Sequence, residues 1–387
     1  MKILQVHNRY QLSGGEDVVV ENEKRLLESK GHIVLQFIKD NKEIIGYSFL
    51  KKAKLINSAV WSKESFKEVK ELIKNVKPDI CHVHNYMPLI SPSVFYACYK
   101  MKVPVVQTLH NYRMLCSNAY LFRNGKACEK CVGKSLYHGV KYGCYRDSRI
   151  QTFTVARMIE INKKKGTWND KIDGYIALTN FSKNKFIEGG LPEDKIFVKP
   201  NFLFEDPGYS EKDENYFLFA GRLDETKGIN VLIETATKSP HIRFKVAGDG
   251  PLKKNIINIP NVEYLGQLNK KELVEKIKNS TALIFPSLLY ENMPMIIIET
   301  FACGKPMIAS NLGAIAELIE DGRTGLLFEP GNANDLAEKI IWAFEHREEM
   351  KQMGMNARKE YEEKYTAEKN YLILMDIYQK AIENSKC

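Results

Sequence analysis

The sequence predicts an α/β protein of two domains, each with a parallel sheet covered by helices. The chain has 387 residues, more than one hydrophobic core usually organises. Short apolar runs alternate with helix-like runs along most of the length, as in parallel α/β domains. The apolar runs are continuous rather than alternating, which is typical of strands buried on both faces.

We expect the first domain to cover residues 1–203. Its predicted strands lie at 3–7, 32–37, 79–84, 103–109, 174–178 and 195–199, and its clearest helices at 18–29 and 182–188. Residues 111–150 interrupt the alternation and form a cysteine-rich insert. A linker that starts at Pro200 leads to the second domain.

The second domain is expected at residues 204–365. Its predicted strands lie at 216–219, 244–247, 262–265, 282–285 and 307–309. We expect the last segment, 366–387, to form a helix that packs back on the first domain.

The stretch from Thr281 to Pro306 carries the strongest functional signal. A buried strand leads into a loop and then a helix, with Pro294 at its first position and Gly304 as its left-handed cap. Loop amides and the positive helix end would form an anion site at the carboxyl end of the strand. The carboxylates of Glu291 and Glu299, with seven residues between them, can accept hydrogen bonds from hydroxyls. A ligand with phosphates and hydroxyls is therefore indicated, such as a nucleotide sugar.

Two other loops follow strands of the same domain. G-R-L-D-E-T-K-G, at 221–228, offers the Arg222 guanidinium and the Lys227 ammonium to a diphosphate. V-A-G-D-G-P, at 246–251, contains Gly248, where the backbone can approach a ligand. The alternatives are surface cations that close a loop and an ordinary tight turn.

Taken in order, these motifs resemble the GT-B-fold retaining glycosyltransferases of family 4, the group 1 glycosyltransferases. The resemblance includes G-R-T-G-L-L-F-E-P-G-N-A-N-D-L-A in the second half, and S-G-G-E, D-I-C-H-V-H-N-Y-M-P and V-P-V-V-Q-T-L-H-N-Y-R in the first. It covers almost the whole chain. Asn292 and Pro200-Asn201-Phe202 depart from the family, which often has glycine after the first glutamate and P-N-G in the linker.

The resemblance implies two facing Rossmann-like domains with a deep cleft that holds the donor. It assigns the diphosphate to Arg222 and Lys227, the hydroxyls of the transferred sugar to Glu291, and the ribose to Glu299. His110 would face the sugar and the reacting centre; without the resemblance we would interpret it as structural. The other implied donor-binding positions are Gly14, Gly15, Gly248, Asn292, Met293, Pro294 and Met295.

The predicted function is that of a retaining glycosyltransferase, which moves a sugar from a UDP- or GDP-sugar to a glycan or lipid-linked acceptor of surface polysaccharide. The sequence has no Asp-x-Asp motif, so we expect no catalytic metal; fixed positive charge would neutralise the leaving diphosphate instead. The alternatives are a GT-B sugar-nucleotide epimerase and, outside enzymes, a basic zinc-knuckle protein that binds nucleic acid.

Four cysteines, Cys116, Cys128, Cys131 and Cys144, are spaced C-x11-C-x2-C-x12-C. This spacing is within the range of a structural zinc site with four thiolates, which would leave no open position for catalysis. Free thiols in an acceptor-side loop are the other interpretation. Disulfides are disfavoured in a reducing compartment.

Charge is distributed unevenly along the chain. Residues 1–200 hold 34 Lys and Arg against 19 Asp and Glu, a net charge of +15, whereas the remainder carries −6. Without a signal peptide or a long apolar run, we expect a cytoplasmic protein, with peripheral contact to the anionic inner face of the membrane as a further hypothesis. Residues 44–61 could form an interfacial helix, but we favour a helix packed on its own domain.

Overall fold

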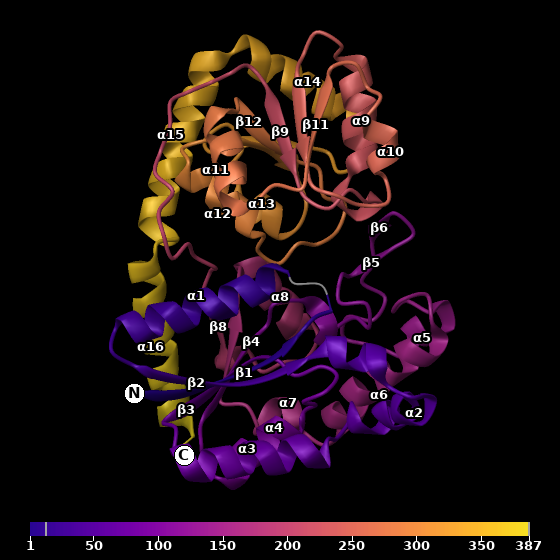
Figure 1. The fold of residues 1–387 in the computed structure, drawn as a ribbon, viewed down its shortest axis with the longest axis vertical. Helices are drawn as coiled ribbons and strands as arrows, with labels where there is room; N and C mark the ends of the chain where they lie inside the picture. Colours follow the sequence, from indigo (N-terminus) through magenta and orange to yellow (C-terminus); the bar gives the residue numbers. More distant parts are fainter. Residues whose placement is uncertain (12–13, 386–387) are drawn as a thin grey trace. The chain divides into compact units, whose positions relative to one another are not determined.

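The computed structural model describes residues 1–11 and 14–385, which fold as two compact units. The first unit comprises residues 1–121, 129–200 and the segment from Asn370 onward; the second comprises 122–128 and 201–369. Each is described by itself (Figure 1). Ser13, part of the S-G-G-E motif, lies outside the described residues, and the cleft expected between the domains stays a prediction.

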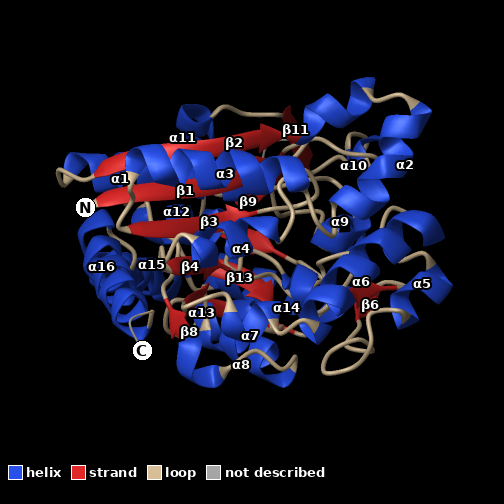
Figure 2. Cartoon of the chain, turned by 90° about the horizontal axis from the view of Figure 1, so that it is seen from below, coloured by secondary structure: helices blue, strands red, loops and turns tan. Residues whose placement is uncertain are grey.

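The first unit contains a six-stranded parallel sheet in the order β2-β1-β3-β4-β7-β8. Figure 2 shows β2, β1 and β3 side by side. Its strands are β1 (Lys2–Arg9), β2 (Ile33–Asp40), β3 (Ile80–Asn85), β4 (Val105–Thr108), β7 (Gly174–Ala177) and β8 (Ile196–Val198). Every residue of β3 is buried, its two histidines included, so this central strand brings polar groups into the core.

Helices connect these strands. They are α1 (Gly15–Ser29), α2 (Phe49–Ser58), α3 (Lys63–Val76), α4 (Ser93–Lys100), α5 (His138–Tyr142), α6 (Arg149–Lys164), α7 (Thr167–Asp170) and α8 (Asn180–Glu188), with short 3-10 turns η1 (Asn41–Gly46), η2 (Tyr112–Met114) and η3 (Glu193–Lys195). The expectation that the helix within 44–61 packs on its own domain holds for its carboxyl end alone: Leu55 and Ile56 are half-buried, and Ala59 and Val60 just after α2 are buried. There Arg157 Nη1 donates to Asn57 Oδ1 at 2.8 Å.

The second unit has its own six-stranded parallel sheet, in the order β11-β10-β9-β12-β13-β14. The strands are β9 (Phe217–Ala220), β10 (Phe244–Ala247), β11 (Val262–Gly266), β12 (Ala282–Phe285), β13 (Met307–Ser310) and β14 (Gly325–Phe328). Phe217, Phe219 and Phe244 form part of a buried apolar cluster between this sheet and its helices. Two such doubly wound sheets are the predicted fold class.

The helices of the second unit alternate with its strands. They are η4 (Glu225–Lys227), α9 (Ile229–Lys238), α10 (Lys253–Ile256), α11 (Lys270–Asn279), α12 (Met295–Ala302), α13 (Ala314–Leu318), α14 (Ala333–Glu345) and α15 (Arg347–Lys364). A small hairpin of β5 (Phe122–Arg123) and β6 (Lys126–Ala127) is also counted with this unit.

The last helix, α16 (Ala367–Asn384), contacts the first unit through buried polar groups. Tyr378 Oη lies 2.8 Å from His82 Nδ1, and Lys199 Nζ donates to Asn370 Oδ1 at 3.1 Å. The helix thereby joins β3 and the end of β8 from a position far along the chain. Within the described residues, no helix combines the length and apolar character needed to cross a membrane.

Candidate active site

The loops that follow β9 and β12 contact each other at the carboxyl edge of the second sheet. The two strands are neighbours, so their ends lie side by side. Leu288 N donates to Thr226 O at 2.9 Å, and Gly228, at φ +71°, lies so close to Pro286 that a Cβ would be 1.8 Å from its carbonyl oxygen. Only glycine fits there, and the contact fixes the two predicted motifs against each other.

Lys227 and Glu291 meet as a result of this contact. Lys227 Nζ donates to Glu291 Oε1 at 2.5 Å, and Ser287 Oγ donates to the same oxygen at 2.7 Å. Both charged side chains remain partly exposed. An ammonium and a carboxylate that share one solvent-facing spot can bind a ligand carrying both phosphate and hydroxyl groups.

Arg222 lies in the same loop as Lys227. Its side chain is exposed and pairs with Asp224, which in turn accepts from Thr226 Oγ1 at 2.6 Å and from Lys227 N at 3.2 Å. Asp224 therefore caps η4 and holds the Arg222 guanidinium at the start of the loop.

The predicted turn at Gly248 also reaches this edge of the sheet. Gly248 has φ +131°, and a Cβ there would be 1.9 Å from Gly221 O. Tyr264 Oη donates to Gly248 O at 2.9 Å. The loops after β9, β10 and β12 are thus held together by backbone contacts.

Helix α12 begins at Met295, as predicted, and Gly304 follows its end at φ +72°. Pro294 is the N-cap rather than the first helical residue, and its side chain makes no capping hydrogen bond. Asn292 and Met293 are buried, and Asn201 Nδ2 donates to Met293 O at 3.0 Å. The Met293 position can therefore contribute only backbone groups to a ligand.

Glu299 lies within α12, and its side chain is only partly buried. Burial raises the pKa of its carboxyl group, and Lys270 opposes the shift. A partly buried carboxyl group on this helix can accept from a hydroxyl, the role expected of it toward a ribose.

His110 belongs to the first unit, two residues after the end of β4, and it contacts another histidine. His84 Nδ1 lies 3.0 Å from His110 Nε2, and the rings stack with centroids 5.3 Å apart. On its other side, His84 Nε2 lies 3.2 Å from Glu23 Oε1. Glu23 is buried and also contacts His82 Nδ1 at 2.8 Å and Lys199 Nζ at 3.3 Å.

The charges in this network follow from burial and pairing. Burial alone would raise the pKa of Glu23, but the neighbouring His82 and the Lys199 ammonium outweigh it and hold that pKa well below its usual value. Desolvation and the charge of His82 lower the pKa of His84 to about 3. Desolvation and His84 hold the pKa of His110 well below its usual value.

Glu23, His82 and His84 are the single group within residues 1–11 and 14–385 whose ligand atoms are close enough to hold a metal. The Lys199 ammonium already neutralises Glu23, which disfavours a cation there.

Cys116, Cys131 and Cys144 of the first unit form no second group of this kind within those ranges. Cys128 is counted with the second unit. The predicted zinc site stays a prediction, which metal analysis of the purified protein would test.

Gly14 is the N-cap of α1, and Gly15 is its first residue. Among the residues that the structure describes, no atom lies within 4 Å of a Cβ placed on Gly14, so packing against them does not require glycine there. Burial and the neighbouring Asp17 raise the pKa of Glu16 to about 8. At neutral pH this carboxyl group is mostly uncharged, so it does not repel an anion that approaches the glycines.

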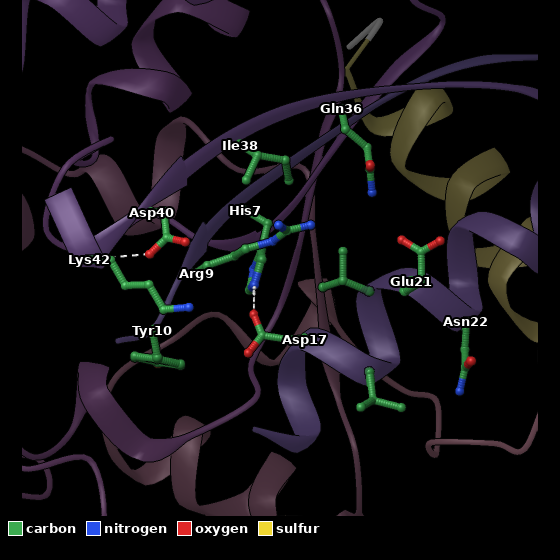
Figure 3. Close-up of a pocket in the computed structure, with 12 residues that line it drawn as sticks. His7, Arg9, Tyr10, Asp17, Glu21, Asn22, Gln36, Ile38, Asp40 and Lys42 are labelled. Carbon is green, nitrogen blue, oxygen red and sulfur yellow. Dashed lines mark hydrogen bonds and ion pairs between the residues drawn. The ribbon is translucent and has the colours of Figure 1, made fainter. Parts of the chain in front are cut away.

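A pocket of about 550 Å³ lies beside α1, β1 and β2 of the first unit (Figure 3). His7 contributes its Nε2, which lies 2.8 Å from Asp17 Oδ1. Cationic and acidic side chains both line it, including Arg9, Lys42 and Glu21. Its lining suits a ligand with several hydroxyls and an anionic group.

Two family models match the chain. The model described as Glycosyltransferase Family 4 matches residues 13–203, and the model described as Glycosyl transferases group 1 matches residues 204–360. The chain belongs to the family 4, group 1 glycosyltransferases.

Three known proteins illustrate the similarity of this glycosyltransferase to others. An uncharacterized glycosyltransferase of Methanocaldococcus jannaschii is 28% identical, with 98% of each chain covered. The poly(ribitol-phosphate) alpha-N-acetylglucosaminyltransferase of Staphylococcus aureus is 24% identical over 88% of this chain and 72% of its own. The crystal structure of Anabaena HepE with UDP and glucose has a TM-score of 0.68 at 18% identity and covers 97% of this chain and 98% of its own. This last likeness shows the GT-B fold.

Sequence reasoning missed several residues that position the site of this glycosyltransferase. Ser287, Asp224 and Asn201 hold Glu291, Lys227 and the loop at Met293, respectively. Of these residues, only Asn201 could have been noticed in the sequence, because it stands in the P-N of the linker. Glu23 gave none, because its partners lie on strands far away in the sequence.

The histidine network predicts how the stability of this glycosyltransferase depends on pH. Folding keeps His84 neutral, so between pH 6.5 and about 3 the unfolded chain binds more protons than the native state. The contribution of the neutral His84 to the free energy of unfolding is fully present above pH 6.5 and is lost as the pH falls. The unfolding free energy of the wild type, relative to that of His84→Asn, should therefore decrease from pH 6.5 to pH 4 in urea titrations. A difference that stays constant would contradict a neutral His84.

Proposed function

We propose that this glycosyltransferase moves a sugar, with retention, from a nucleotide diphosphate sugar to a glycan or lipid-linked acceptor of a surface polysaccharide. The observation that carries the proposal is the Lys227–Glu291 pair at the carboxyl edge of the second sheet. The Anabaena structure with UDP and glucose supports a nucleotide sugar as donor, and the Staphylococcus relative supports a polymeric acceptor. No comparison favours the epimerase or the nucleic-acid binder.

In this proposal Lys227 and Glu291 bind different parts of the donor. The Lys227 ammonium binds the diphosphate together with Arg222, and Glu291 accepts hydrogen bonds from hydroxyls of the transferred sugar. Glu299 binds the ribose, and the amides at the start of α12 face the phosphates. Ser287 keeps Glu291 in place when the phosphate competes for Lys227.

Fixed charge would stabilise the departure of the nucleotide. As the bond between sugar and diphosphate breaks, negative charge grows on the phosphate oxygens, where Arg222, Lys227 and the helix end would stabilise it. We propose that this arrangement needs no catalytic metal. The departing phosphate then takes the proton of the acceptor hydroxyl, which attacks the same face of the sugar.

We place the acceptor in the pocket beside α1 in the first unit (Figure 3). Glu21 and Asp17 would accept from acceptor hydroxyls, and Arg9 and Lys42 would bind an anionic group such as a phosphate. A sugar attached to a phosphate has both features, as a lipid-linked acceptor does.

We further propose that the α2 surface, defined as Ile45, Phe49, Leu50, Lys51, Lys52 and Lys54, binds an anionic membrane. Ile45, Phe49 and Leu50 are 70%, 85% and 73% exposed, and all three lysines beside them are exposed. Exposed apolar side chains flanked by cations match a bilayer surface of anionic lipid, which is where a lipid-linked acceptor resides.

The donor site is tested with two opposite variants. Thermal-shift screening against UDP-, GDP-, ADP- and dTDP-sugars first identifies the donor. Glu291→Gln should then lower kcat about 10²-fold or more while the free nucleoside diphosphate still binds, since the ammonium remains. Lys227→Ala should weaken diphosphate binding at least about ten-fold because it removes a direct phosphate contact.

Lys238→Ala is the matched control, since Lys238 forms an exposed ion pair with Glu234 on α9. Lys238→Ala should change neither kcat nor the affinity for the nucleoside diphosphate. Unchanged turnover in Glu291→Gln would remove Glu291 from the site, and donor hydrolysis with inversion at C2 would favour the epimerase.

The acceptor pocket predicts a different kinetic signature. Arg9→Ala and Glu21→Gln should each raise the KM for the acceptor several-fold, while binding of the nucleoside diphosphate measured by calorimetry stays the same. Glu28→Gln, an exposed change on the same helix, should have no effect. If the donor KM changes and the acceptor KM does not, the acceptor does not occupy this pocket.

Membrane binding is measured by co-sedimentation with vesicles. The wild type should bind phosphatidylglycerol-containing vesicles and not pure phosphatidylcholine. Replacing Lys51, Lys52 and Lys54 by Gln should cost roughly 1 kcal/mol per lysine and reduce the dependence on salt. Phe49→Ser with Leu50→Ser should also weaken binding, whereas Leu372→Ser, which is exposed on α16, should not. Equal binding by all variants, or self-association through α2 without lipid binding, would overturn the assignment.

A further inference from the structure

A chain of polar groups connects the buried Glu23 on α1 to His110. Glu23 and His84 are 1% and 3% exposed, while His110 is the partly exposed end of the chain. The links are the contacts Glu23–His84 at 3.2 Å and His84–His110 at 3.0 Å. Such a chain determines which nitrogen of each ring carries the proton.

The first link begins with a carboxylate. Glu23 Oε2 lies 3.3 Å from the Lys199 ammonium, and Oε1 lies 2.8 Å from His82 Nδ1. These contacts with cationic and donor groups favour the ionised carboxylate and so lower the pKa of Glu23. An ionised carboxylate can only accept hydrogen bonds.

The second link decides the proton position on His84. Its low pKa leaves this ring neutral, with one proton for two nitrogens. Nε2 faces the Glu23 carboxylate at 3.2 Å, although the angle is too poor for a good hydrogen bond. A lone pair directed at an anion would be repelled, whereas an N–H is attracted, so the proton belongs on Nε2 and the lone pair on Nδ1.

The third link transfers this preference to His110. Because His84 Nδ1 carries a lone pair, His110 Nε2 must be the donor in the 3.0 Å hydrogen bond. A neutral His110 then has no proton on Nδ1. Its second nitrogen is left as an acceptor.

We propose that Glu23 and His84 are positioning residues which fix His110 as its Nε2–H tautomer, so that Nδ1 accepts a hydrogen bond from a substrate hydroxyl. The contact with a substrate hydroxyl rests on the proposed function; the tautomer does not. Tyr378, Thr108 and Lys199 complete the surroundings by holding His82 and Glu23 in place. The proposal gives a role to a buried carboxylate that no part of the donor site uses.

The test is nitrogen-15 NMR of protein labelled on histidine, without any ligand. Two-bond proton–nitrogen correlations distinguish the two neutral tautomers, and His110→Gln identifies the signals of His110. At neutral pH the wild type should show a protonated Nε2 and an unprotonated Nδ1 for His110. The opposite tautomer, or a fully protonated ring, would overturn the proposal without the need for any other variant.

Glu23→Gln supplies the second arm. Its amide can donate to His84 Nε2, which would reverse both links and move His110 toward the Nδ1–H tautomer. We expect kcat to fall roughly ten-fold with an unchanged donor KM, the size typical when one hydrogen bond to the reacting substrate is lost. If His110 keeps its Nε2–H tautomer in folded Glu23→Gln, Glu23 does not set the proton position on His110.

Glu360→Gln is the matched control, because Glu360 is a buried carboxylate of the second unit that pairs with Arg323 and Lys364. It should lower stability without changing the His110 signals or kcat. If the wild-type tautomer is as stated but no nucleotide sugar supports transfer, the relay stands and the proposed function fails. If transfer occurs but His110 has the Nδ1–H tautomer, the proposed function stands and the role of Glu23 and His84 fails.

Discussion

The close approach of Gly228 to the carbonyl of Pro286 is the constraint on which the donor site of the second unit depends. It joins the loops after two neighbouring strands, and the backbone bond from Leu288 to Thr226 secures them. Lys227 and Glu291 can then share one exposed position, although 63 other residues separate them in the sequence. A side chain at Gly228 would separate the loops and, with them, the two charges.

The first unit is organised around a different constraint, a buried anion. Removing Glu23 from water is costly unless its charge is matched, and the structure matches it with groups from β3 and from the end of β8. Helix α16 adds Tyr378 and Asn370 to the same network. Four segments of the chain therefore contribute to one network around Glu23, and this network ends at the partly exposed His110.

The sequence predicted the features that depend on local pattern. Continuous apolar runs located the strands of both sheets, and Pro294 with Gly304 located α12 to within one residue. It did not predict that Lys227 pairs with Glu291, or that Glu23 contacts two histidines, because such contacts depend on which strands are neighbours. For α2 it predicted the packing of the carboxyl end on the first unit but not the exposure of Phe49 and Leu50, since an amphipathic pattern is the same whether apolar residues meet a core or remain exposed.

The division of the chain has a consequence for synthesis on the ribosome. Domains usually fold in order as they emerge, and the segment 201–369 is continuous. The first unit, however, lacks Tyr378 and the rest of α16 until the segment 201–369 has been translated. The first unit, most of which is synthesised first, therefore completes its folding last. Until α16 is added, its charged interior is incompletely packed.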